Sequence, residues 1–129
     1  MSLQFVNVDL ESESKKPLEG IVAEFIDNDH EPLHYEKHER SWIATFEVSC
    51  GNNDGNPDSV INRFIEIIER FDEETKKEWD NAFTKVFDIG LEVTGEYSRF
   101  QEELKPKTIN LISKYGASVA FTVYPLEQE

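Results

Sequence analysis

The chain has 129 residues, of which 38% are hydrophobic and 12% aromatic, which is enough for one domain with a single buried core and too apolar for a disordered acidic protein. Its 27 acidic and 13 basic residues give a formal net charge of -14, which makes binding to nucleic acid or to an anionic membrane unfavourable. The acids are spread over both halves of the chain. We therefore expect one domain over residues 1–129 whose acidic surface attracts a basic protein partner.

The sequence also bears on the compartment of the protein. Cys50 is the one cysteine, so no internal disulfide can form. The N-terminus has no basic segment followed by an apolar run, and no apolar stretch approaches the roughly 20 residues that span a bilayer. These features favour a soluble, cytoplasmic protein.

The first elements in chain order are predicted to be a strand and a helix. Val6, Val8 and Leu10 alternate with polar residues, which predicts a strand over about residues 3–11 with these three side chains facing the core. Pro17 suits the first turn of a helix that ends near Asn28. Its apolar positions recur with helical spacing at Leu18, Ile21, Val22, Phe25 and Ile26.

A β-hairpin is predicted next. Leu33 and Tyr35 alternate with polar residues after Pro32, and a second alternating segment, residues 41–50, follows a polar turn. We expect Leu33 and Tyr35 to face the core with Trp42, Ala44, Phe46 and Val48. The segment GNNDGNP, residues 51–57, is rich in loop-forming residues and ends the hairpin.

The middle of the chain predicts the clearest helix, with Asp58 or Ser59 as its N-cap. Its wide apolar face consists of Val60, Ile61, Phe64, Ile65, Ile67, Ile68 and Phe71. Residues 72–83 either continue this helix or form a second one capped by Asp72. In both cases we expect three inward-facing side chains, which are Trp79, Ala82 and Phe83.

The last third predicts a strand, a helix and a final strand. Phe87, Ile89, Leu91 and Val93 alternate with polar residues or glycine. A helix begins at Pro106 and ends at Gly116, and Val119, Phe121 and Val123 share one face of the strand that follows. The order β-α-β-β-α-β plus α-β predicts an α+β fold, a ferredoxin-like, mostly antiparallel sheet with helices on one face.

All three histidines lie in the segment HEPLHYEKHER, residues 30–40. His34, Glu36 and His38 would share one strand face, and two imidazoles with a carboxylate suit zinc only if another ligand comes from elsewhere. Residues 30–34, HEPLH, have the letters of the HExxH zinc motif, but that motif binds zinc from one face of a helix, and Pro32 in its middle disfavours a helix. The segment contains no CxxC pattern. We therefore interpret it as the solvated face of a hairpin strand and keep a metal site that includes His30 as an alternative.

Other sequence features carry no recognisable catalytic motif. Cys50 has no associated base, and the chain contains no phosphate-binding glycine loop and no serine-nucleophile elbow. Acidic pairs are frequent, but 27 acids produce such pairs by number alone, and neighbouring helical residues point to different faces. No enzyme class and no cofactor is predicted.

One resemblance covers residues 42–124. Trp42 opens a strand, a long amphipathic helix follows, and Gly116 and Tyr124 bracket the last strand. This succession resembles small acidic bacterial domains of unassigned function that serve as immunity proteins beside polymorphic or contact-dependent toxins. The resemblance implies a cytoplasmic, non-enzymatic protein that binds and blocks one cognate toxin, often a basic nuclease, and it carries over no site residues.

The leading functional hypothesis is thus an inhibitor that binds a basic toxin domain. Its contact surface is expected to include the acids Glu66, Glu69, Asp72, Glu73 and Glu74. Two alternatives stay open. One is a metal-dependent enzyme or sensor built on residues 30–38, and the other is an accessory domain that binds a small molecule.

Overall fold

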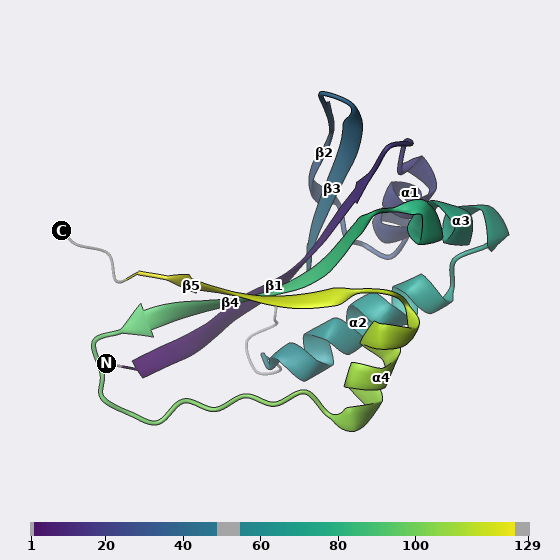
Figure 1. Ribbon diagram of the computed structural model, residues 1–129. Helices are drawn as coiled ribbons and strands as arrows, with labels where there is room; N and C mark the ends of the chain where they lie inside the picture. Colours follow the sequence, from purple (N-terminus) through teal and green to yellow (C-terminus); the bar gives the residue numbers. More distant parts are fainter. Residues whose placement is uncertain (1, 49–54, 126–129) are drawn as a thin grey trace.

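The computed structural model describes residues 2–48 and 55–125, and it contains one five-stranded sheet with four helices (Figure 1). Cys50 and most of the predicted loop lie outside the described residues. The elements in chain order are β1 (Ser2–Ser14), α1 (Glu19–Asp27), β2 (Pro32–His38), β3 (Ser41–Val48), α2 (Pro57–Glu69), α3 (Glu73–Asn81), β4 (Thr84–Thr94), α4 (Pro106–Lys114) and β5 (Ser118–Tyr124).

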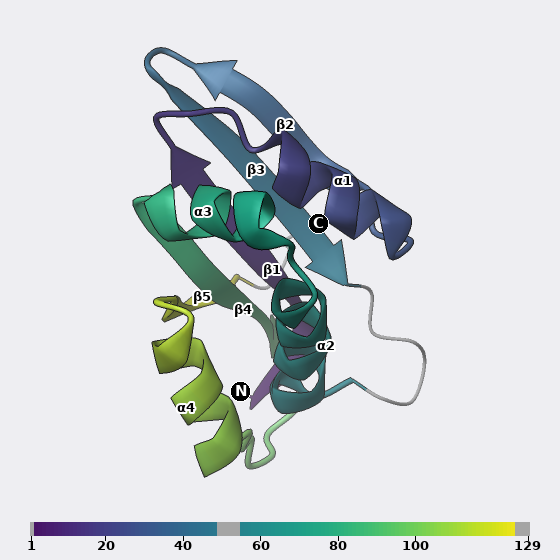
Figure 2. The same cartoon turned by 90° about the vertical axis from the view of Figure 1, so that its right-hand side faces the viewer.

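The sheet is mostly antiparallel, as the sequence predicts. Its strand order is β2-β3-β1-β4-β5, in which β5 pairs with β4 in parallel and every other pair is antiparallel. All four helices lie on the same side of the sheet (Figure 2), so its other face has no helical cover. No helix in the described part of the chain has both the length and the apolar character needed to cross a bilayer.

The core lies between the sheet and the helix layer. Phe25 of α1 stacks on Phe46 of β3 with ring centroids 4.1 Å apart, and Phe64 of α2 lies 5.9 Å from Phe25 and 5.8 Å from Phe87 of β4. The predicted apolar face of α2 is confirmed, since its members from Val60 to Ile68 are buried. Aromatic rings thus join α1, α2 and the central strands.

The ends of the two middle helices differ partly from expectation. The N-cap of α2 is Asn56, whose side chain accepts the Ser59 N–H at 2.8 Å; the prediction of Asp58 or Ser59 was wrong because Pro57 already occupies the first turn. α3 is a separate helix, and Asp72 caps it by accepting the Thr75 N–H at 2.8 Å. The second of the two predicted arrangements is therefore the observed one.

Two strand irregularities expose side chains that we expected in the core. The register of β1 against β4 shifts between Phe5 and Asn7, and Val6 at this bulge is exposed. A second shift, between Pro32 and His34 of β2, exposes Leu33 in the same way. A bulge reverses which residues face the core, because side chains alternate along a strand.

Two further core predictions were wrong and one turn prediction is confirmed. Ile26 near the end of α1 is exposed, and so is Phe83, which follows the extended residue at the C-terminus of α3. Gly116 follows α4 with a φ of 69°, the left-handed conformation that favours glycine after a helix. The turn is closed by the Ala117 N–H, which donates to the Ile112 carbonyl at 3.0 Å.

A carboxylate from another helix satisfies the N-terminus of α1. The residue at its N-cap position, Leu18, offers no side-chain acceptor. The Glu78 side chain of α3 instead accepts the Gly20 N–H at 3.0 Å and the Ile21 N–H at 3.3 Å. Gly20 permits this approach, because a Cβ at that position would lie 2.6 Å from Glu78 Oε2 and 2.8 Å from Thr75 Oγ1. The contact fixes α1 against α3.

Candidate functional site: an acidic sheet face

The uncovered face of the sheet carries a cluster of carboxylates. Along β1 the buried residues Val8, Leu10 and Ser12 alternate with acids, so the acids point to the side without helices. The pairing registers place acids of β3 and β4 on the same side. We call this surface the acidic sheet face; its half-buried members are Asp9, Glu11, Glu13, Glu47, Asp88 and Glu92.

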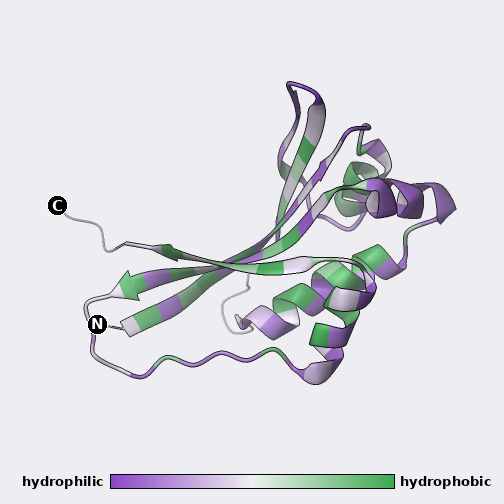
Figure 3. Cartoon of the chain, in the orientation of Figure 1, coloured by the Kyte–Doolittle hydropathy of each residue, from purple (hydrophilic) through white to green (hydrophobic). Residues whose placement is uncertain are grey.

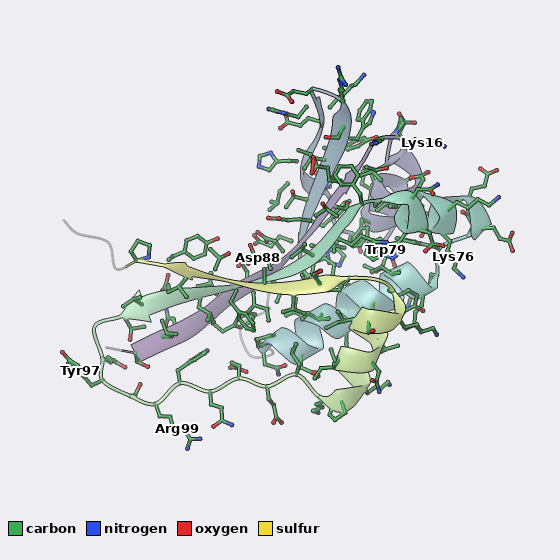
Figure 4. The ribbon with its side chains drawn as sticks, viewed as in Figure 1. Lys16, Lys76, Trp79, Asp88, Tyr97 and Arg99 are labelled. Atoms are coloured by element: carbon green, nitrogen blue, oxygen red, sulfur yellow. The ribbon has the colours of Figure 1, made fainter. Side chains whose placement is uncertain are left out.

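Three of these acids form a row across neighbouring strands. Asp9 on β1 pairs in register with Glu47 on β3 and with Asp88 on β4. Adjacent strands lie about 4.8 Å apart, so the three carboxyl groups are close enough to repel one another. Figure 4 shows Asp88 on the side of the sheet away from α2 and α4. Like charges brought together in this way indicate a surface that suits a cationic partner.

Polar neighbours hold the two outer acids of this row. The Thr122 hydroxyl of β5 donates to both Asp88 carboxylate oxygens, at 2.8 and 3.0 Å. The Asn7 side-chain amide donates to Glu47 Oε2 at 3.1 Å. In contrast, Asp9 Oδ1 is buried and has no hydrogen-bond partner in the structure. The central acid is therefore the least satisfied member of the row.

The pKa of Asp9 reflects this environment. Burial raises it from the ordinary value of 3.8 to about 6, and the neighbouring carboxylate of Glu47, followed by the charges of Asp88 and Glu11, adds to the effect. Asp9 is thus mostly ionised at neutral pH, where the row is more negative than in mild acid. A cation bound over the row would stabilise that charged state.

The raised pKa makes a prediction about stability. Because the folded state binds the Asp9 proton more tightly than the unfolded state does, this contribution is present at low pH and is lost as pH rises from about 4 to 6. Asp9→Asn imitates the neutral form, so we expect it to raise the free energy of unfolding at pH 7 by about 1 kcal/mol, allowing for solvent screening, and to have little effect at pH 4. Urea unfolding at both pH values measures the difference.

The matched control for this experiment is Glu36→Gln, which removes one acid from the exposed strand β2. It is expected to change the free energy of unfolding by less than about 0.5 kcal/mol at either pH. A stability gain of the same size for both variants would mean that net charge, and not the environment of Asp9, is responsible.

The histidine segment lies on the edge strand β2. Tyr35 faces the helices as predicted, where its hydroxyl accepts the Leu18 N–H at 2.9 Å, while His34, Glu36 and His38 are exposed. His30 precedes the strand, and its backbone N–H donates to the Phe25 carbonyl. Within residues 2–48 and 55–125, no group of three His, Cys, Asp or Glu side chains is arranged to hold a metal ion.

The acids proposed from the sequence lie on the opposite side of the molecule, on α2 and at the start of α3. All five are exposed: Glu66, Glu69, Asp72, Glu73 and Glu74. Asp72 has a structural role, since its hydrogen bonds with Thr75 at the helix start lower the pKa of its carboxyl group. The folded molecule thus has two separate acidic surfaces. The row of Asp9, Glu47 and Asp88 can be recognised only when the pairing registers of β1 with β3 and β4 are known.

An apolar cavity of about 380 Å³ lies between the sheet and the segment that joins β4 to α4. Ile89, Leu91 and Phe121 form its sheet side, and Phe100 and Leu104 its outer wall. Its polar lining residues, Gln101, Glu102 and Glu103, are all exposed at the rim. The volume suits a small ligand, but the lining offers no buried polar group to orient one.

The residues that carry the resemblance to immunity-type domains have structural roles. Trp42 packs against Tyr35 with ring centroids 5.4 Å apart, Gly116 forms the turn after α4, and Tyr124 ends β5. These residues stabilise the fold, and their contacts do not indicate a particular function. Comparisons with family models, with curated proteins and with solved structures found no match for this chain.

Proposed function

We propose that the protein is a non-enzymatic, immunity-type inhibitor that acts in the cytoplasm by binding the basic, nuclease-type domain of a cognate bacterial toxin. The observation that supports this proposal is the acidic sheet face, in which three central strands present carboxylates on the side without helices. The described positions of this face contain no lysine or arginine. Such a surface complements the cationic cleft that a nuclease uses to bind phosphates.

The shape of the surface favours a protein over a small ligand. The acids stand on the open face of the sheet, and none of its six named acids lines the apolar cavity beside Phe100. A broad open surface can contact many side chains of a protein at once. Because the acids already repel one another, cations of a partner would relieve the repulsion as well as form ion pairs.

We further propose that the first four strands form a ferredoxin-like unit. In that arrangement β1 lies between the third and fourth strands, and the β2–β3 hairpin extends one edge, which agrees with the strand order β2-β3-β1-β4. The pair α4 and β5 is then an addition that widens the sheet by one parallel strand. In this interpretation the addition leaves the acidic sheet face open.

The test of function is binding to basic protein domains encoded next to the gene for this chain. We expect one of them to bind with nanomolar affinity, and the affinity to fall as salt rises, because screening weakens attraction between opposite charges. Replacing Glu11, Glu47 and Asp88 by their amides is expected to weaken binding at least tenfold at low salt. Calorimetric titration at two salt concentrations measures both effects.

The matched control removes three acids from the helical side, through Glu66→Gln, Glu69→Gln and Glu73→Gln. This variant has the same net charge as the sheet-face variant, so long-range attraction is equal and only the contact surface differs. A loss confined to the helical variant would move the binding surface to α2 and α3. If no neighbouring basic product binds, the inhibitor hypothesis fails.

A further inference from the structure

The two edges of the sheet differ in how they are protected against pairing with another strand. The edge strand β2 contains Pro32, His34, Glu36, Lys37 and His38, and also a bulge. Proline, charges and bulges are the features that prevent an edge from pairing with another chain. This edge is therefore blocked.

The opposite edge, β5, has none of these protective features. Its seven residues, SVAFTVY, include no charge and no proline, and β4 is its only strand neighbour among the described residues. Phe121 is 67% exposed, and Val123 and Tyr124 are exposed as well. Figure 3 shows this strand in green and pale tones, in contrast to the purple of α3. An uncharged, apolar edge with free backbone groups is a template for another strand.

The charge of the chain changes at this edge. Residues 105–125, which include α4 and β5, contain three lysines and no acid, whereas residues 1–104 contain 25 acids and 10 bases. The remaining two acids, Glu127 and Glu129, follow in the sequence, outside the described residues. Two copies of a protein with a net charge of -14 repel each other over most of their surface. The β5 edge is the region where they can approach with the least repulsion, although Glu102 and Glu103 lie beside Phe121 around the cavity.

The residues on either side of Phe121 in β5 are similar in polarity and arranged symmetrically about it. In an antiparallel pair centred on Phe121, that residue faces itself, and Val119 of one copy faces Val123 of the other. Ala120 faces Thr122 in the same way. A two-fold interface requires such self-complementarity, because each contact occurs twice. This symmetry favours a second copy over a strand from an unrelated protein.

We propose that the protein forms a two-fold symmetric dimer through antiparallel pairing of β5 with β5 of a second copy, which joins the two sheets into one ten-stranded sheet. The pairing covers the apolar side chains of the edge and leaves the acidic sheet face of both copies open. It is independent of the proposed function, since it concerns a different surface and needs no toxin. A single strand edge is a small interface, so we expect a dissociation constant on the order of 10 µM.

Sedimentation velocity over a range of protein concentrations tests the proposal. We expect a concentration-dependent dimer that becomes tighter as salt rises, because screening reduces the repulsion between two acidic bodies. Binding to a basic toxin has the opposite salt dependence, which separates the two phenomena. A protein that remains monomeric at concentrations far above 10 µM would overturn the proposal.

Charge substitutions at Phe121 test the symmetry directly. Phe121→Lys and Phe121→Glu are each expected to weaken the dimer at least tenfold, because like charges then face each other, and an equimolar mixture of the two variants should dimerise again. Leu33→Lys, at an exposed residue of the other edge, is the matched control and should leave the dimer intact. Circular dichroism checks that each variant is folded.

Several other results of these experiments would contradict the dimer through β5. A dimer that survives Phe121→Lys, or that is lost with Leu33→Lys, would contradict pairing through β5. A mixture of the lysine and glutamate variants that stays monomeric would contradict the placement of Phe121 opposite itself. If the protein alone is monomeric but Phe121→Lys weakens binding to a toxin domain, the edge accepts a strand of the partner and the dimer proposal is wrong.

Discussion

Replacing Trp79 by alanine is expected to lower the free energy of unfolding by about 3–5 kcal/mol, the usual cost of removing a large buried aromatic side chain. Trp79 is 1% exposed, and its ring lies 6.2 Å from that of Phe71. Its indole N–H donates to the Tyr115 carbonyl at the end of α4, at 2.8 Å, and Lys85 of β4 lies 5.5 Å from the ring centre. One side chain thus joins α3 to α4 and to the sheet (Figure 4).

Trp79→Phe separates packing from hydrogen bonding. Phenylalanine keeps most of the apolar contact but leaves the Tyr115 carbonyl without its donor, so we expect a loss of about 1–2 kcal/mol. Urea unfolding followed by circular dichroism measures both variants without depending on tryptophan fluorescence. If Trp79→Ala costs no more than Trp79→Phe, the ring contributes little packing energy and this account of the α3 contacts is wrong.

Removing the Glu78 carboxylate is the second substitution with a large expected effect. Glu78→Ala leaves the N–H groups of Gly20 and Ile21 without their acceptor at the start of α1, and Ile21 is fully buried. Hydrogen bonds to a charged acceptor contribute about 1.5–3 kcal/mol, and the negative charge also interacts favourably with the positive end of the helix dipole. We therefore expect a loss of about 2 kcal/mol in the free energy of unfolding, measured by urea denaturation.

Two control variants show whether the contact itself is responsible. Glu78→Gln keeps an oxygen acceptor without the charge, so it should cost less than Glu78→Ala. Glu74→Ala removes an exposed acid from the same helix and should change the free energy of unfolding by less than about 0.5 kcal/mol. Equal losses for Glu74→Ala and Glu78→Ala would show that α3 is destabilised for local reasons and that its carboxylate does not cap α1.

Hydrophobic periodicity was sufficient to predict most elements. The helical repeat of apolar residues predicted α2, and Asp72 and Gly116 marked the start of α3 and the end of α4. Alternation predicted the two strands of the hairpin and β4. These predictions succeeded because helix caps, turns and the alternation of side chains depend on residues that are close together in the chain.

The exceptions depend on how strands pair. Val6 and Leu33 fit the alternation and were expected in the core, yet bulges expose both. Phe121 and Val123 share a face of β5, as predicted, but they remain exposed at the edge of the sheet. A pattern in one strand cannot reveal a register shift or the edge of a sheet, since both are set by the partner strands.

The acidic sheet face also could be predicted only in part from the sequence. The sequence by itself determined the sign of the surface charge, the α+β class and the alternation that directs Asp9 to the polar side of its strand. Only the tertiary structure decided that Asp9 lies between Glu47 and Asp88, residues 38 and 79 positions away in the chain, on a face without helices. The reason is physical: charge and periodicity are properties of the chain alone, whereas a row across three strands exists only when their hydrogen bonds fix the register.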